Sequence, residues 1–160
     1  MSTLALIAGS GGLPAALVAA LPQRPLVCAL DGFQPTALAV DQVFRVERLA
    51  LFLRHLQDAG ITQVAFAGAV QRPRLDPSLF DPQTALMVPR LLAAMQGGDD
   101  ATLRAVIGIF EEAGFDIVGV ESIAPALVPA AAVLTGTLTP QIESDASRAA
   151  QITAALGAVD

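Results

Sequence analysis

A glycine-rich turn near the start of the chain combines residues that could bind an anion. It follows an apolar run at residues 3–8 and has the sequence GSGGLP over residues 9–14. Glycine lets a ligand approach the backbone closely, and a helix that begins after such a turn presents free N–H groups. Pro14 stands where the dinucleotide fingerprint has glycine, so that match is partial. We expect phosphate or nucleotide contacts from five residues: Gly9, Ser10, Gly11, Gly12 and Leu13. A tight turn without a ligand is the alternative.

A second loop of suitable chemistry follows the apolar run at residues 63–67. Loops at the carboxyl ends of strands line the ligand crevice of open α/β sheets. The guanidinium groups of Arg72 and Arg74 could pair there with a diphosphate, although surface arginines need no such explanation. The residues expected at the substrate are Gly68, Ala69, Val70 and Arg72.

Carboxylates occur at two further places of interest. Asp31 follows the apolar run at residues 25–30, where a dinucleotide-binding domain carries a ribose-binding carboxylate; an ordinary Asp-Gly turn is the simpler interpretation. Gly98, Asp99 and Asp100 join two predicted helices. A helix stop followed by an aspartate cap accounts for them, but two adjacent carboxylates could also help to hold Mg²⁺.

Alternating strands and helices must position these residues. Short apolar runs bounded by glycine suit strands that are buried in a parallel sheet. We predict strands at residues 3–8, 25–30, 42–46, 63–67 and 116–120, and a short one at 132–134. Helices are predicted at 14–21, around 49–56, at 89–96, after Asp99, and at 144–156. The helix after Asp99 should have a buried stripe of Leu103, Val106, Ile107 and Phe110. The prediction is one α/β domain over residues 1–160, Rossmann-like and three-layered with a mainly parallel sheet.

Composition excludes several classes of protein. A hydrophobic content of 54% is incompatible with a disordered chain, and a net charge of −6 argues against a nucleic-acid partner. The uncharged segment 3–21 is interrupted by glycines and Pro14, so we expect neither a spanning helix nor a signal peptide, and a cytoplasmic location. Cys28 should pack as a small hydrophobe, and the single histidine, His55, should lie on the surface.

Four segments together resemble one protein family. They are LIAGSGGLP at residues 6–14, AGAVQRP at 67–73, GDDATLR at 98–104, and FEEAGF followed by GVE within 110–121. In this order they resemble the N-terminal domain of the Mg²⁺-dependent UDP-2,3-diacylglucosamine pyrophosphatases of lipid A biosynthesis. The resemblance extends over essentially the whole chain.

The resemblance implies hydrolysis of UDP-2,3-diacylglucosamine to UMP and 2,3-diacylglucosamine 1-phosphate, with the substrate held between two domains. The aspartate essential for hydrolysis in that family belongs to a second domain, which this chain lacks. No residue here therefore inherits a catalytic role, the Mg²⁺ ligands are unassigned, and the chain alone should be inactive. By resemblance, Gly98, Asp99 and Asp100 join the two glycine loops on the substrate side.

Several alternatives stay open from the sequence. One is a dinucleotide-binding module with Gly9, Gly11 and Asp31 at the cofactor, and another is a non-catalytic interaction domain whose glycines serve turns only. A homodimer and a peripheral contact with the inner membrane are also open.

Overall fold

The computed structural model describes residues 3–71, 73–129 and 135–157. The chain divides into two compact units, Met1–Val128 (unit 1) and Pro129–Asp160 (unit 2), and each is described by itself. The prediction that residues 1–160 form one domain therefore stays a prediction.

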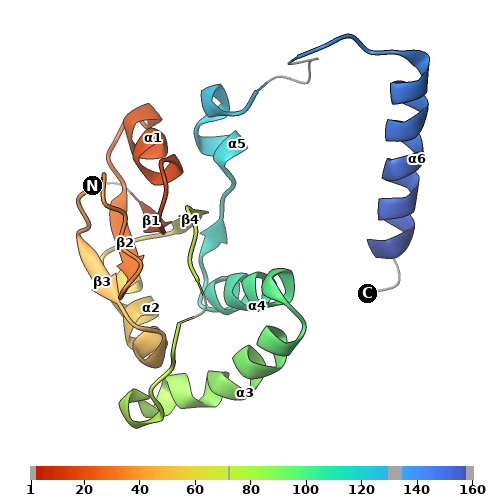
Figure 1. Cartoon of the computed structure of the whole chain (residues 1–160). Coiled ribbons are helices and arrows are strands. Elements are labelled where there is room, and N and C mark those ends of the chain that lie inside the picture. The colour runs from red at the N-terminus through yellow and green to blue at the C-terminus, as the bar shows by residue number, and fades with distance from the viewer. Residues whose placement is uncertain (1–2, 72, 130–134, 158–160) are drawn as a thin grey trace. The chain divides into compact units, whose positions relative to one another are not determined.

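Unit 1 is built on a five-stranded parallel sheet (Figure 1). The strand order is β3-β2-β1-β4-β5, which is also the order in doubly wound folds that bind dinucleotides. The strands are β1 (Leu4–Ala8), β2 (Leu26–Leu30), β3 (Gln42–Phe44), β4 (Gln63–Ala67) and β5 (Asp116–Ile117). Every residue of β1 is buried, as expected for a central strand covered on both faces.

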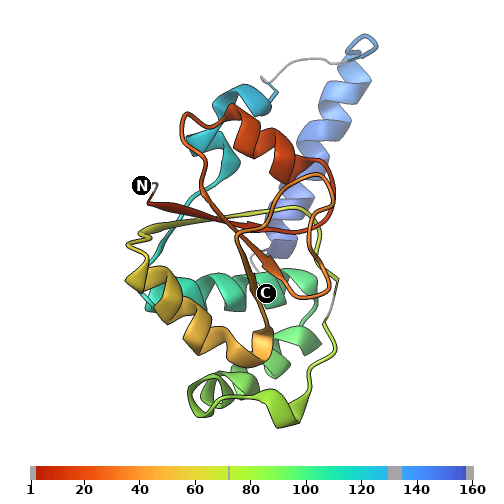
Figure 2. The ribbon, with the colours of Figure 1, turned by 90° about the vertical axis from the view of Figure 1, so that its left-hand side faces the viewer.

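Helices cover both faces of this sheet (Figure 2). Ala5 and Ile7 of β1 belong to a core cluster shared with α2, α3 and α4, whereas Leu4, Leu6 and Ala8 pack with α1 and the end of α5. The three-layer α/β fold with a parallel sheet is thus confirmed. The helices are α1 (Leu13–Ala20), α2 (Leu49–Asp58), α3 (Pro82–Gln96), α4 (Asp99–Glu112) and α5 (Val120–Ile123), with 3-10 turns η1 (Val46–Arg48), η2 (Pro77–Leu79) and η3 (Pro125–Leu127).

The start of α3 differs from the prediction. The helix begins at Pro82, not near Pro89, because the buried carboxylate of Asp81 accepts hydrogen bonds from the backbone N–H groups of Gln83 and Thr84, each 3.0 Å long. Proline at the first helical position suits this cap, since its missing N–H would have had no partner in the helix. Pro89 lies inside the helix and forgoes one backbone hydrogen bond.

The start and the buried face of α4 also differ. Its N-cap is Gly98, with a φ of +106°, and no side chain caps the helix, so neither Asp99 nor Asp100 is the predicted cap. Both lie in the first turn, where the helix dipole favours carboxylates. The buried residues are Ala105, Ile109 and Phe110; Val106 and Ile107 are half-buried, and Leu103 is 48% exposed.

The remaining corrections concern the end of the chain. The strand predicted at 116–120 stops at Ile117, because Gly119 begins α5 as its N-cap. The strand predicted at 132–134 falls outside the described residues. In unit 2, α6 (Pro140–Gly157) begins four residues before the predicted start at Ser144. No helix in the described ranges is long and apolar enough to cross a membrane.

A buried polar network fastens the segment that leaves β4. The Thr84 hydroxyl is fully buried; it accepts a 2.9 Å hydrogen bond from the N–H of Ala50 and donates to the Asp81 carboxylate. The side chain of Glu47 accepts a 2.9 Å hydrogen bond from the N–H of Asp76. Residues 76–84 are thereby tied to η1 and to the start of α2.

Thr84→Val should destabilise unit 1 by about 1–3 kcal/mol, because the N–H of Ala50 and the Asp81 carboxylate both lose a buried partner. Chemical denaturation of the variant and the wild-type chain measures the difference. Thr62→Val, at an exposed threonine, is the matched control and should change stability by less than about 0.5 kcal/mol. Equal effects of the two variants would contradict a structural role for the Thr84 hydroxyl.

Glu47 makes the stability of unit 1 depend on pH. Burial alone would raise the pKa of this carboxyl, but the hydrogen bond from Asp76 and the Arg45 guanidinium outweigh burial, and the pKa lies below its ordinary value of 4.5. A lowered pKa stabilises the folded state above the ordinary value, and this stabilisation disappears as pH falls through the folded value.

Thermal melting between about pH 7 and pH 3 should therefore show a smaller loss of stability in Glu47→Gln than in the wild-type chain. Glu47→Gln should already be less stable by about 1–3 kcal/mol at neutral pH, because the charged acceptor is lost. Glu111→Gln, at an exposed glutamate of α4, should keep the wild-type pH dependence. Parallel pH profiles for Glu47→Gln and the wild type would refute the assignment.

Candidate functional site

The candidate site lies where the order of strands in the sheet reverses. The chain proceeds from β1 through β2 to β3 on one side, and then returns to place β4 on the other side of β1. Loops that follow β1 and β4 leave the same edge of the sheet, and ligands of open α/β folds bind in the crevice at this position. Both glycine loops predicted from the sequence start here.

The two loops are joined by backbone hydrogen bonds. Ser10 and Ala69 form an antiparallel bridge with two N–H···O bonds of 2.9 Å, and the Ser10 hydroxyl donates a further 3.0 Å bond to the Ala69 carbonyl. The N–H of Gly9 donates to the carbonyl of Ala67 at 2.8 Å. The structure thus brings together residues that are 59 positions apart in the chain.

Gly9 and Gly68 are required by this contact between loops. A Cβ on Gly9 would lie 2.5 Å from the Ala69 carbonyl oxygen, and one on Gly68 would lie 2.7 Å from the backbone of Gly9 and of Ser10. Both distances are too short for any side chain. These two glycines have a packing role whether or not a ligand binds.

Gly11 and Gly12 differ, because they face open space. A Cβ at either position would meet no atom within 4 Å. Gly12 is the N-cap of α1 in an ordinary helical conformation, with φ −84° and ψ −21°, while Gly11 has a φ of +101°. The N–H groups of the first turn of a helix have no acceptor within the helix. The turn therefore offers accessible N–H groups at the positive end of α1, and the side chains of Leu13 and Val70 are exposed.

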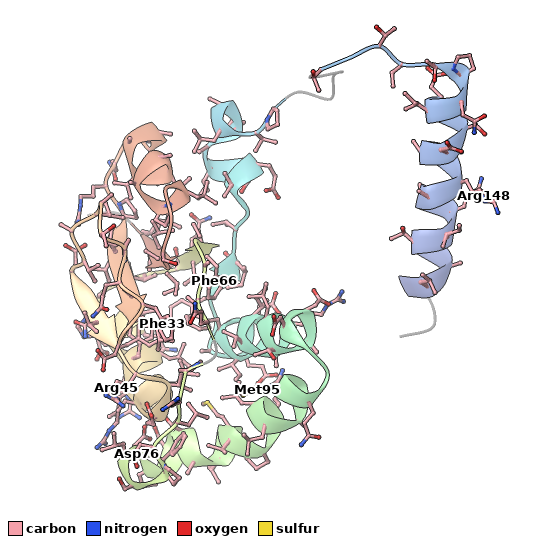
Figure 3. The ribbon with its side chains drawn as sticks, in the orientation of Figure 1. Phe33, Arg45, Phe66, Asp76, Met95 and Arg148 are labelled. Carbon is pink, nitrogen blue, oxygen red and sulfur yellow. The ribbon has the colours of Figure 1, made fainter. Side chains whose placement is uncertain are left out.

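A small cleft lies at the carboxyl ends of β2 and β3 (Figure 3). Its volume is about 80 Å³, and its polar walls include Asp31, Arg45, Glu47 and Arg74, with Phe33 beside them. Arg45 contacts the Asp31 carboxylate at 2.8 Å and the Glu47 carboxylate at 3.4 Å. Both carboxylates are therefore already engaged by a cation.

Asp31 belongs to a turn. Gly32 has a φ of +84°, and the N–H of Phe33 donates a 2.9 Å hydrogen bond to the carbonyl of Leu30. This confirms the Asp-Gly turn that we considered the simpler interpretation. Arg45 is not among the residues predicted for the site, although it lies just after β3, at the edge that binds ligands in such sheets.

The arginines of the β4 loop are only partly described. Arg74 is exposed and lines the small cleft, so its guanidinium lies on the ligand side of the sheet. Arg72 lies outside the described residues, and its predicted contact with a diphosphate stays a prediction.

The junction Gly98–Asp100 forms the start of α4, and its predicted place at the substrate stays a prediction. Asp100 forms an ion pair of 2.8 Å with Arg104, one turn further along the helix. In the part of the chain that the structure describes, no group of three or more His, Cys, Asp or Glu side chains could hold a metal ion. The prediction that Asp99 and Asp100 help to hold Mg²⁺ stays a prediction, and we derive no metal-dependent step from them.

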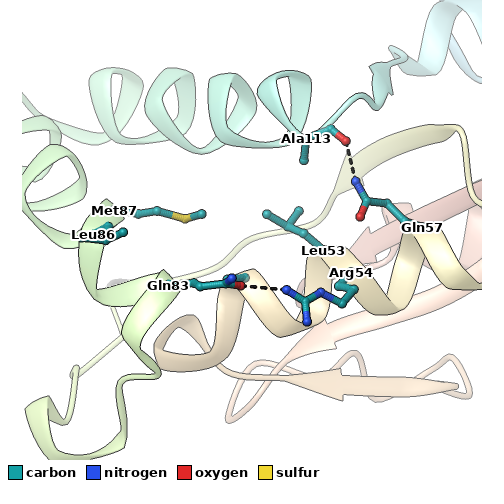
Figure 4. Close-up of a pocket in the computed structure, with 8 residues that line it drawn as sticks. Leu53, Arg54, Gln57, Gln83, Leu86, Met87 and Ala113 are labelled. Atoms are coloured by element: carbon teal, nitrogen blue, oxygen red, sulfur yellow. Dashed lines mark hydrogen bonds between the residues drawn. The ribbon is translucent and has the colours of Figure 1, made fainter.

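A larger groove lies elsewhere, between α2 and the first half of α3 (Figure 4). Its volume is about 390 Å³, and none of the predicted site residues lines it. Its polar contacts are internal: Arg54 donates to Gln83 at 3.0 Å, and the Gln57 amide donates to the carbonyl of Ala113 at 2.8 Å. The larger volume of this groove is therefore not evidence that it is the functional site.

The contrast between Gly9 and Gly12 can be tested by stability. Gly9→Ala should destabilise unit 1 by about 1–3 kcal/mol or more, because the new methyl group forces the two loops apart. Gly12→Ala adds the same methyl group in open space at a permitted φ, and should change stability by less than about 0.5 kcal/mol. Thermal and denaturant unfolding of both variants measures this. A Gly9→Ala protein as stable as Gly12→Ala would show that the bridge is not formed.

Comparison with known proteins agrees with the boundary of unit 1. Residues 3–127 match the family model described as the LpxI N-terminal domain. The chain is 29% identical over 168 aligned residues to the UDP-2,3-diacylglucosamine pyrophosphatase LpxI of Caulobacter vibrioides. That alignment covers 100% of this chain and 59% of the relative, so the chain spans less than two thirds of the length of the protein it matches. On this evidence the chain belongs to the LpxI family, and residues 3–127 are its N-terminal domain.

Proposed function

We propose that unit 1 is the substrate-binding part of a UDP-2,3-diacylglucosamine pyrophosphatase of lipid A biosynthesis. The observation that carries this proposal is the open turn at Gly11 and Gly12, placed at the strand-order reversal of an LpxI N-terminal domain. The relative's name supplies the substrate, and the turn supplies a site of suitable chemistry for the diphosphate.

In this proposal the chain binds and orients the substrate. The N–H groups at the start of α1 donate hydrogen bonds to a phosphate, and the exposed Arg74 adds positive charge near the small cleft. Hydrolysis then adds one water across the diphosphate: one P–O bond breaks, and UMP and 2,3-diacylglucosamine 1-phosphate leave. We assign no residue of this chain to activation of that water.

Mg²⁺ would supply neutralisation of the charge on the diphosphate oxygens when bound. Because Mg²⁺ is usually held by few carboxylates, several waters and the substrate phosphates, it does not need an all-protein cage. We assign no residue of this chain as a ligand of Mg²⁺.

The dinucleotide-binding alternative is less well supported. Asp31 would have to bind a ribose, but its carboxylate already contacts Arg45. Pro14 is buried at the position where the fingerprint has glycine. UDP or a UDP-sugar is therefore a better candidate ligand than NAD.

The isolated chain should bind UDP weakly and prefer it to NAD. We expect a millimolar dissociation constant, which corresponds to about −4 kcal/mol, because the ligand would contact unit 1 on one side only. NMR titration should show shifts concentrated at residues 9–13 and 68–70. Gly12→Ala should weaken UDP binding several-fold without loss of stability, because its methyl group occupies the space a phosphate needs.

The matched control is Ala20→Val, which adds bulk at an exposed position at the opposite end of α1 and should leave UDP binding unchanged. Micromolar binding of NAD without binding of UDP would replace the pyrophosphatase proposal with the dinucleotide one. Absence of binding of either nucleotide at high concentration would favour a non-catalytic interaction domain.

A further inference from the structure

The outer face of α3 is apolar and uncovered. In both views of the ribbon, α3 lies at the edge of unit 1 farthest from α1 (Figures 1 and 2). Leu86 is 83% exposed and Leu92 is 48% exposed. Single exposed leucines are ordinary, but a contiguous apolar face usually marks an interaction surface. The exposed positions on this side, called the α3 face below, are Pro82, Ala85, Leu86, Pro89, Leu92, Ala93 and Gln96.

The α3 face can be buried without desolvating a charge. Arg90 is the only charged residue of the helix, and its guanidinium already forms a 2.6 Å ion pair with Glu112 of α4. The opposite side of α3 is occupied, since Thr84 and Leu91 are buried within unit 1. The α3 face is therefore free to meet another surface, and that surface should be apolar.

The α3 face is symmetric about Pro89. Counting outward from Pro89 in both directions, leucines occur at 86 and 92, alanines at 85 and 93, and exposed residues again at 82 and 96. A two-fold axis through Pro89 would place Leu86 opposite Leu92 of an antiparallel second copy, and Ala85 opposite Ala93. The spacing of three and four residues is that of a helix–helix seam. An isologous interface requires such self-complementarity.

We propose that a second copy of this chain docks on the α3 face, so that two antiparallel α3 helices pair about Pro89. The groove between α2 and α3 adjoins this face through Leu86 and adds the apolar side chains of Leu53 and Met87 (Figure 4). One helix face buries less than the roughly 1,200–2,000 Å² of a standard interface, so the dimer should be of micromolar affinity.

A membrane fits the same face less well. Helices that lie on membranes usually carry Lys and Arg on their polar side, where these residues attract anionic lipids. The chain contains no lysine and has a net charge of −6, and the one arginine of α3 is paired. An uncharged face on an acidic protein matches a copy of itself better than an anionic lipid surface.

Analytical ultracentrifugation of the 160-residue chain, in a series reaching several hundred micromolar, tests the proposal. The wild-type mass should rise with concentration from 16.4 kDa toward twice that value. Leu86→Glu should remain a monomer throughout, and circular dichroism should show it folded because the side chain is 83% exposed. Leu51→Glu, at a leucine of α2 that is 45% exposed, is the matched control and should dimerise like the wild type.

Cysteine cross-linking tests the two-fold axis itself. The natural Cys28 is fully buried, and burial raises the pKa of its thiol to about 12, so it should not react. Pro89→Cys should form a disulfide-linked dimer under mild oxidation. Leu86→Cys should not cross-link with itself, because the two copies of position 86 are offset by about 9 Å along the axis, beyond the reach of a disulfide. A mixture of Leu86→Cys and Leu92→Cys should cross-link.

Three results would overturn the proposal. The first is a wild-type chain that stays at 16.4 kDa at every concentration. The second is a Leu86→Glu protein that dimerises as well as Leu51→Glu, or a Leu86→Cys protein that cross-links as fast as Pro89→Cys. The third is co-sedimentation of the monomer with anionic phospholipid vesicles that is lost in Leu86→Glu, which would assign the α3 face to a membrane.

Discussion

The backbone contact between the loops after β1 and β4 is the constraint on which the site depends. Two reciprocal hydrogen bonds between Ser10 and Ala69 hold the loops so close that only glycine fits at positions 9 and 68. These two glycines are therefore required for packing, whereas the next two glycines of the turn are not. Gly11 and Gly12 precede α1, Gly12 as its N-cap, and both are exposed. Within one glycine-rich segment, Gly9 thus allows the two loops to pack closely, whereas Gly11 and Gly12 leave the backbone exposed. The glycine content of the segment does not distinguish these two roles.

A buried hydrogen-bond network fixes the next segment of the chain, between the β4 loop and the start of α3. The segment after β4 is tied to η1 by the hydrogen bond from the N–H of Asp76 to Glu47, and α3 is held at its first turn by Asp81 and Thr84. These acceptors are buried, so loss of one partner would leave the other without compensation. The same polar contacts that place the β4 loop at the ligand edge also fix α3, which leaves its apolar face directed outward. The proposed ligand site and the α3 face therefore depend on one buried network without sharing residues.

Much of this fold could be predicted from the sequence because its strands are short apolar runs bounded by glycine. The strand at 63–67 was predicted at its observed limits, and buried Cys28 and exposed His55 were predicted correctly. The errors arose where one residue has two interpretations. The sequence predicts a helix start at Pro89, although a capped turn at Asp81 precedes it, and it predicts caps at the aspartates after Gly98, where the N-cap is Gly98 itself. No local pattern predicts that Arg45 meets Asp31, since that contact depends on the pairing of β2 with β3.

The charges at the carboxyl edge of the sheet are consistent with the binding role that we propose for unit 1. A general base needs a carboxylate or imidazole that is free to accept a proton from water. Asp31 contacts Arg45, and Glu47 is buried and held by Arg45 and the Asp76 backbone. The pKa of Glu47 is lowered, which makes it a weaker base still. What the edge presents instead are N–H groups and guanidinium groups, which stabilise phosphate oxygens but cannot activate a nucleophile. In the function that we propose, another surface would supply the base, and the substrate diphosphate would contact both surfaces.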